Sequence, residues 1–121
     1  MSKAAFTIKV FAVYLFGLGL GLMLLPNLLL ALFAFAPTGE VWIRVLGFVV
    51  IELAICYGFA GVSEARPFFV ATVFGRLLAL LAFAAFAGLG LAKPTLILFG
   101  VVDTLGALWT WRALRTAAAR A

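Results

Sequence analysis

Residues 41–63 read VWIRVLGFVVIELAICYGFAGVS, and only two of these side chains, Arg44 and Glu52, are charged. About 20 mostly apolar residues are enough for an α-helix to cross the hydrocarbon core of a bilayer. Three further stretches have the same character, and they cover residues 10–36, 68–91 and 95–111. The pattern predicts a membrane protein that crosses the bilayer several times.

The composition of the whole chain agrees with this interpretation. Hydrophobic residues make up 68% of the 121 residues and charged residues 11%. Soluble domains average about half apolar and a quarter charged residues, so this chain has too few polar residues to cover a water-exposed surface. Its length fits one domain, and we expect a single transmembrane domain over residues 1–121 with the lipid bilayer around it.

Short connections between the apolar stretches predict how they are arranged. We expect spans at about residues 9–25, 41–63, 68–91 and 95–111. The first stretch should bend at Pro26, because proline interrupts a helix, and continue along the interface to residue 36. Short turns make neighbouring helices antiparallel. The expected fold class is therefore all-α, an integral membrane antiparallel four-helix bundle.

Basic residues predict the orientation of this bundle. The net charge of +5 comes mostly from residues at the ends of the stretches, where positive charge orients membrane helices, and we expect no nucleic-acid partner. Lys93 and Arg44 lie toward one side. The other side, which holds both termini, collects Lys3, Lys9, Arg66, Arg112, Arg115 and Arg120. The bias predicts that both termini lie in the cytoplasm.

Three charged side chains inside the spans are the main candidates for function. At about 1.5 Å per residue, Glu52, Arg76 and Asp103 lie roughly 16, 14 and 14 Å from the cytoplasmic edge. Charges inside a membrane are costly unless they face one another, water or a substrate path. Arg44 enters from the opposite end of the second span and reaches toward Asp103. We therefore expect these four residues to form an intramembrane charge network.

Polar neighbours share helix faces with these charges. Thr72 lies one turn before Arg76, and Cys56 lies one turn after Glu52. Thr110 shares a small and polar face with Asp103, and Tyr14 is the polar member of the first span. We expect these four residues to border the charge network, with Cys56 as a small buried apolar side chain.

Several kinds of site are excluded by the residue types that the chain lacks. It contains no histidine, so histidine-ligated haem, histidine-based metal sites and a Ser-His-Asp triad are unavailable. Cys56 is its single cysteine, which rules out an internal disulfide and a CxxC redox pair. We expect neither a metal nor a cofactor, and no enzymatic activity.

Three strings of residues carry a family resemblance. They are VWIRVLG at residues 41–47, RPFF at 66–69 with Thr72, Val73 and Arg76 after it, and LFGVVD at 98–103 followed by GALWT at 106–110. In these strings the chain resembles small uncharacterised bacterial four-helix membrane proteins, loosely the BphX-like and DoxX-like families. The resemblance implies the bundle fold and a bacterial inner membrane, and it brings no agreed activity with it.

Two functions follow from the charge layer. In the first, the ions fix helix register in a non-catalytic accessory or scaffold subunit. In the second, the protein is a proton-coupled carrier or a small lipophilic-ligand binder that uses Glu52 or Asp103 together with Arg76. So small a bundle has little interior of its own, and we expect a homo-oligomer or a subunit of a larger membrane complex.

Overall fold

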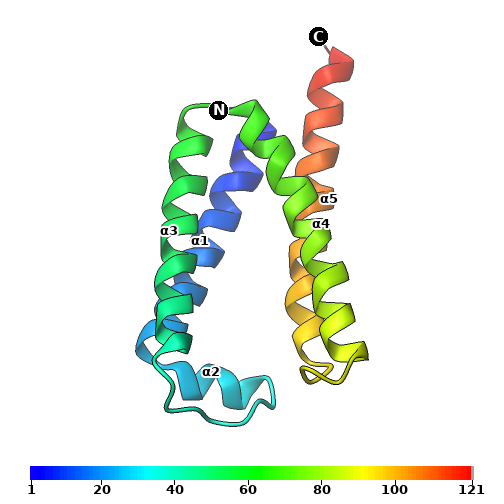
Figure 1. Ribbon diagram of the computed structural model, residues 1–121. Coiled ribbons are helices and arrows are strands. Elements are labelled where there is room, and N and C mark those ends of the chain that lie inside the picture. Colours follow the sequence, from blue (N-terminus) through cyan, green and yellow to red (C-terminus); the bar gives the residue numbers. More distant parts are fainter. Residues whose placement is uncertain (121) are drawn as a thin grey trace.

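Five helices make up the part of the chain that the structure describes. The computed structural model describes residues 1–120, and the side chains of residues 1–117. The helices are α1 (Lys3–Leu24), α2 (Pro26–Leu32), α3 (Trp42–Val62), α4 (Arg66–Gly88) and α5 (Leu96–Arg120). Within the described residues, all four long helices are long and apolar enough to cross a membrane, and they run antiparallel (Figure 1). The predicted all-α bundle is confirmed.

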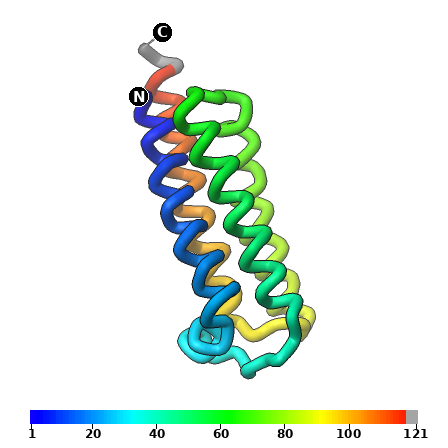
Figure 2. The backbone as a smooth tube through the Cα atoms, turned by 90° about the vertical axis from the view of Figure 1, so that its left-hand side faces the viewer, coloured from blue at the N-terminus to red at the C-terminus, as the bar shows by residue number. Residues whose placement is uncertain are grey.

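Both ends of α1 follow from local chemistry. The Ser2 hydroxyl accepts a hydrogen bond from the backbone amide of Ala5 and caps the helix, so α1 begins at Lys3 and not at residue 9. At the other end Leu25 leaves the helical conformation, with φ −132° and ψ 55°, and Pro26 begins α2. The bend at Pro26 is confirmed, and the segment after it forms a separate short helix. Figure 2 shows α2 end-on, lying across the end of α1.

The long helices form two pairs. α1 packs mainly against α3, α4 packs mainly against α5, and contacts between α1 and α5 join the pairs. Glycines let the first pair approach closely, because a Cβ atom on Gly47 would lie only 2.6 Å from the backbone nitrogen of Met23. One on Gly19 would lie 2.8 Å from the carbonyl oxygen of Gly47. Small residues at such a contact are typical of membrane helix pairs.

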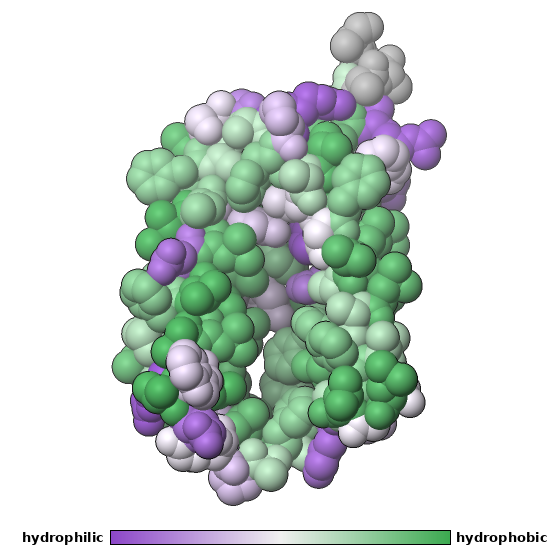
Figure 3. Space-filling view, viewed as in Figure 1, coloured by the Kyte–Doolittle hydropathy of each residue, from purple (hydrophilic) through white to green (hydrophobic). Residues whose placement is uncertain are grey.

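The two pairs meet at one end of the bundle and diverge toward the other (Figure 1). We call the end that holds the start of α1 and the C-terminal part of α5 the terminal end, and the opposite one the α2 end. Buried apolar side chains concentrate in the terminal half, and they include Ile8, Phe11, Tyr57, Phe69, Ala107 and Leu114. Between the pairs the space-filling view is hollowed below its middle (Figure 3).

Candidate functional site

Among the described side chains, Arg76 is the charged residue that the bundle buries. It projects from α4 with only 4% of its surface exposed. Its Nε donates to the carbonyl oxygen of Thr72 at 3.2 Å. Its Nη2 donates to two hydroxyls, to Thr72 Oγ1 at 3.1 Å and to Thr110 Oγ1 at 2.9 Å. Thr72 is placed for this by the helix itself, since residues four apart lie on one face.

A chain of hydroxyls continues from Arg76 to α1. Thr110 Oγ1 lies 2.7 Å from Thr7 Oγ1, and both side chains are buried. Thr7 donates its single hydroxyl proton to the carbonyl oxygen of Ala4, so Thr110 must be the donor in the bond between the two threonines. The polar cluster of Thr7, Thr72, Arg76 and Thr110 therefore connects α1 with α4 and α5 and holds the two helix pairs together.

Thr7 was missing from the predicted site. The predicted first span starts at residue 9, which placed Thr7 outside it. One signal in the sequence would have found it, since Thr7, Phe11 and Tyr14 recur at helical spacing and share one face of α1. Thr72, Thr110 and Tyr14, in contrast, lie in or beside the polar region of the structure, as their helix faces predicted.

One nitrogen of Arg76 remains without a partner. Among the described residues, Nη1 is buried and makes no hydrogen bond. The guanidinium carbon lies 4.7 Å from the centre of the Phe11 ring, within the range of a cation–π contact. A Cβ atom on Gly106 would come within 3.1 Å of Nη1 and within 3.0 Å of the Phe11 ring, so the missing side chain of this glycine gives the guanidinium its space.

A cavity of about 410 Å³ separates the two helix pairs on the α2 side of this cluster. We call it the central cavity. Its walls are mostly apolar, and all four long helices and the α2 segment contribute to them through side chains that include Leu18, Leu22, Phe33, Val50, Phe83 and Phe99. Tyr14 and Asp103 are the polar side chains among its lining residues. The hollow in Figure 3 lies in this region between the pairs.

Asp103 belongs to both the cavity and the neighbourhood of Arg76. It lies on α5 one turn before Gly106, whose backbone borders the Arg76 guanidinium, and it is half-buried. The opposite charges of Asp103 and Arg76 attract each other. The hydrogen bonds of Arg76, however, go to hydroxyls and a carbonyl oxygen. The structure thus brings Arg76 and Asp103 into one region and leaves the carboxylate facing the cavity.

The α2 segment closes the cavity at the α2 end. The rings of Phe33 and Phe99 lie 4.5 Å apart between their centres, and this contact joins the end of α2 to α5. Leu29 packs against α1, where a Cβ atom on Gly21 would lie 2.6 Å from its Cδ1. Both helix pairs therefore contact the short helix that lies across their ends.

Glu52 and Arg44 lie outside the polar region, and the predicted four-residue network is wrong in these two members. Glu52 is exposed on the outer face of α3. Arg44 is exposed as well, and its Nη1 donates to the backbone carbonyl oxygen of Met23 on α1. The reason is packing: α3 turns its small residues toward α1, with Gly47 and Gly61 both buried, and this orientation carries the charged face outward.

Cys56 follows Glu52 by one turn and is also exposed, so its predicted burial is wrong for the same reason. Glu52 lies on the outer face of α3 and Asp103 lines the central cavity, so the two carboxylates do not belong to one site. Over the part of the chain that the structure describes, no cluster of three or more cysteine, aspartate or glutamate side chains is placed to hold a metal ion.

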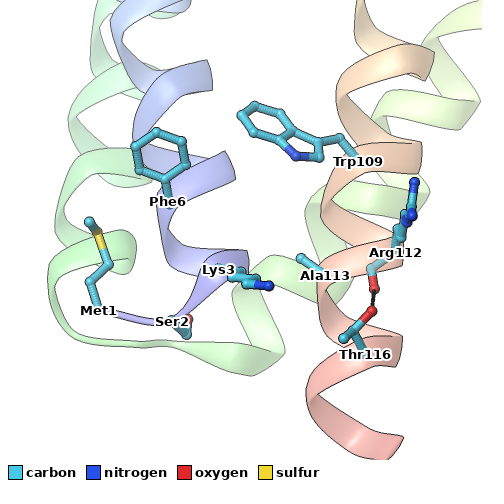
Figure 4. A pocket seen from close by; sticks show the side chains of 8 residues that line it. All are labelled: Met1, Ser2, Lys3, Phe6, Trp109, Arg112, Ala113 and Thr116. Carbon is cyan, nitrogen blue, oxygen red and sulfur yellow. Dashed lines mark hydrogen bonds between the residues drawn. The ribbon is translucent and has the colours of Figure 1, made fainter.

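A second cavity, of about 620 Å³, lies at the terminal end between α1 and α5. We call it the terminal pocket. Figure 4 shows its side chains, which include Ser2, Lys3, Phe6, Trp109, Arg112 and Thr116. The Phe6 and Trp109 rings meet edge to face, with 6.0 Å between their centres. Thr116 Oγ1 donates to the carbonyl oxygen of Arg112 at 2.9 Å, the dashed line of the figure.

Glu64, in the turn between α3 and α4, is tied to the start of α1. Its Oε1 accepts from the Ser2 amide at 2.7 Å and its Oε2 accepts from the Ser2 hydroxyl at 2.6 Å. These two hydrogen bonds, the side-chain one first, hold the pKa of the exposed Glu64 carboxyl below its ordinary value of 4.5.

Comparison of the chain with protein-family models, with curated proteins and with solved structures finds no match. The resemblance to the BphX-like and DoxX-like families stays a prediction. Any functional argument therefore depends on the geometry of the two cavities and of the polar cluster.

Proposed function

We propose that the protein binds a small lipophilic molecule in the central cavity. The observation that carries this proposal is an apolar space of about 410 Å³ with a carboxylate and a phenol among its lining groups. Sites for small molecules typically enclose roughly 300–1,000 Å³, with mostly apolar walls and a few polar groups that fix orientation. Asp103 and Tyr14 are placed for that second role.

The lining groups define the chemistry of the ligand. An ionised Asp103 only accepts hydrogen bonds, so it selects a molecule with a hydroxyl or amine group attached to an apolar body. Arg76 stands near the carboxylate and supplies a compensating positive charge. Its Nη1 is buried and makes no hydrogen bond among the described residues, and Arg76 is not one of the side chains that line the cavity. Glu52 takes no part, because it lies on the outer face of α3.

Photolabelling with a defined probe tests the proposal. The protein is placed in phosphatidylcholine nanodiscs and irradiated with a decan-1-ol derivative that carries a diazirine group. Labelled peptides should come from the cavity faces of α1 and α5. Asp103→Asn should reduce labelling about tenfold, because hydrogen bonds to charged groups contribute about 1.5–3 kcal/mol.

Matched variants separate this result from general effects of substitution. Glu52→Gln removes a carboxylate from the outer face of α3 and should leave labelling unchanged. Leu18→Trp fills the cavity and should abolish labelling, whereas Leu78→Trp changes a side chain that is 64% exposed and should not. Equal labelling of Asp103→Asn and Glu52→Gln, or of the two tryptophan variants, would show that the cavity is not the site.

Glu52 favours a second candidate function, that of an accessory or scaffold subunit. It sits midway along α3 with its side chain exposed, next to exposed apolar side chains such as Phe48 and Phe59. A carboxylate facing lipid at that depth costs a few kcal/mol. We infer that another polypeptide, either a second copy or a different subunit, covers this face.

Native mass spectrometry of the protein, extracted gently from its own membrane, tests the assembly. A defined complex that dissociates in the Glu52→Leu variant, and persists in Val13→Leu on the exposed face of α1, would support the subunit role. If the parent protein and the Val13→Leu variant were both monomers, the subunit role would be contradicted. The ligand proposal does not depend on that result.

A further inference from the structure

The terminal pocket differs from the central cavity in the sign of its charge. Its charged lining side chains are Lys3 from α1 and Arg112 from α5, and both are basic. The pocket is also the larger of the two, at about 620 Å³. In Figure 4, Lys3 extends from α1 toward Ala113 of α5, and Arg112 lies beyond it on the α5 side.

These two cations keep their donors available. Glu64 approaches the same end of α1, but both of its carboxylate oxygens accept hydrogen bonds from Ser2. Among the described side chains, neither the Lys3 ammonium nor the Arg112 guanidinium makes a hydrogen bond or an ion pair with a carboxylate. A cavity with two such cations and no acidic side chain among its described lining residues is complementary to an anion.

Two aromatic side chains, Phe6 and Trp109, form part of the remaining wall of the pocket. Phe6 and Trp109 are 48% and 45% exposed, and they lie on the side of the pocket nearer the middle of the bundle (Figure 4). In a membrane-spanning helix, tryptophan at this position marks the interface between headgroups and hydrocarbon. In Figure 4, Lys3 lies below these rings, and the Arg112 side chain reaches up toward the level of Phe6 on the α5 side. An occupant is therefore offered both cations and apolar rings.

We propose that the terminal pocket binds an anionic glycerophospholipid of the surrounding bilayer. Its phosphate lies between Lys3 and Arg112, which donate charge-assisted hydrogen bonds, and Arg112 suits phosphate through its planar fork of donors. The first part of an acyl chain lies against Phe6 and Trp109. Basic pockets beside membrane helices recognise anionic headgroups in this manner.

Net charge decides which headgroup fits. A zwitterionic lipid such as phosphatidylcholine brings a quaternary ammonium close to its phosphate, and this cation would be repelled by Lys3 and Arg112. Phosphatidylglycerol carries the same phosphate diester with an uncharged glycerol in that place. The pocket should therefore prefer phosphatidylglycerol, and free phosphate, which lacks the acyl chain, should bind more weakly than the lipid does.

Lipid titration followed by native mass spectrometry tests the proposal, with the full-length protein held in a neutral detergent. Each basic residue near an anionic lipid contributes about fivefold in affinity, so Lys3→Gln with Arg112→Gln should weaken phosphatidylglycerol binding by about 25-fold. Lys93→Gln removes one positive charge in the connection between α4 and α5 at the α2 end and should not change binding. Phosphatidylcholine should bind the parent protein no better than phosphatidylglycerol binds the double variant.

Three outcomes would overturn the proposal. The first is an unchanged affinity of the double variant for phosphatidylglycerol, and the second is equal affinity of the parent protein for both lipids. In the third, inorganic phosphate displaces phosphatidylglycerol at concentrations equal to that of the lipid, which would identify a soluble anion as the ligand. Asp103→Asn should leave this binding unchanged, so the result is independent of the central cavity. Melting temperatures measured without added lipid check that the exposed substitutions preserve the fold.

Discussion

The contact within the α1–α3 pair and the contact between the two pairs are built in different ways. Inside the pair, Gly19 and Gly47 bring the two backbones together. Between the pairs, the polar cluster joins the helices near the terminal end, and a cavity separates them toward the α2 end. Apolar side chains gain little by leaving apolar lipid, so close backbone packing and hydrogen bonds are the means that remain for joining membrane helices. The protein uses one within a pair and the other between pairs.

The largest effect on stability is expected from a substitution that forces α1 and α3 apart. Gly47→Ala places a methyl group 2.6 Å from the backbone nitrogen of Met23, and the backbone cannot move away as a flexible side chain would. We expect the free energy of unfolding, measured in mixed micelles with increasing dodecyl sulfate, to fall by about 2–3 kcal/mol.

Gly58→Ala on the same helix is the matched control. A Cβ atom there meets nothing within 4 Å, so the better helix propensity of alanine should raise the free energy of unfolding by up to about 1 kcal/mol. Equal effects of the two substitutions would contradict the close contact between α1 and α3.

Removing one hydroxyl from the polar cluster should have the next largest effect. Thr110→Val takes a partner from Arg76 and another from Thr7, while the guanidinium stays buried. We expect the free energy of unfolding to fall by about 1–2 kcal/mol in the same assay. Thr104→Val removes a buried hydroxyl of α5 that has no hydrogen bond among the described residues, so it should leave stability unchanged or raise it. A loss as large as that of Thr110→Val would argue against the cluster as the joint between pairs.

A smaller effect is expected at the far end of the cavity. Phe33→Ala removes the ring contact between the end of α2 and Phe99, which should lower the free energy of unfolding by about 1 kcal/mol. It should also speed the release of the decanol probe, because α2 closes that end. Leu32→Ala, at a side chain that is 71% exposed, is the control and should change neither quantity. Unchanged probe release in Phe33→Ala would show that ligands do not pass α2.

The smallest expected effect is a pH dependence at the terminal end. Folding lowers the pKa of Glu64 below its ordinary value of 4.5, so the unfolded chain binds more protons than the folded one in that range. The Ser2–Glu64 contact therefore stabilises the fold above about pH 4.5 and loses its contribution as the pH falls through the lowered pKa. Melting curves between pH 6 and pH 3 should show this loss in the parent protein and a smaller one in Glu64→Gln. Parallel curves would mean that the contact does not contribute.

The sequence was sufficient for the helices and for part of the polar region. Length and hydropathy predict where the spans lie, and proline predicts the bend before α2. Thr72 could be grouped with Arg76, and Thr110 with Asp103, because helical spacing fixes which side chains of one helix share a face. That grouping needs no knowledge of the neighbouring helix.

Which face turns inward could not be predicted for α3. α3 has a charged stripe with Glu52 and a small-residue stripe with Gly47 and Gly61, and both are regular. Burying the first would take a charge out of lipid, and burying the second would let a neighbouring helix pack closely. The choice depends on whether the partner helix offers a complementary surface, and α1 offers Gly19 at the matching height. Such complementarity belongs to the pair of helices and is absent from either sequence pattern alone.

The polar cluster lies at one end of the central cavity, so a small rotation about the cluster would displace the far ends of the helices by a larger distance. Gly88, the last residue of α4, lies about 18 Å along the helix from Arg76 at roughly 1.5 Å per residue. If the α4–α5 pair rotated by about 5° around the cluster, this distance of about 18 Å would move Gly88 by about 1.6 Å relative to α1 and α3. The hydrogen-bond distances within the polar cluster would change far less, because the cluster lies at the centre of the rotation. A rotation of this size would change the width of the cavity and the contact of Phe33 with Phe99, while the hydrogen bonds of the polar cluster stay in place.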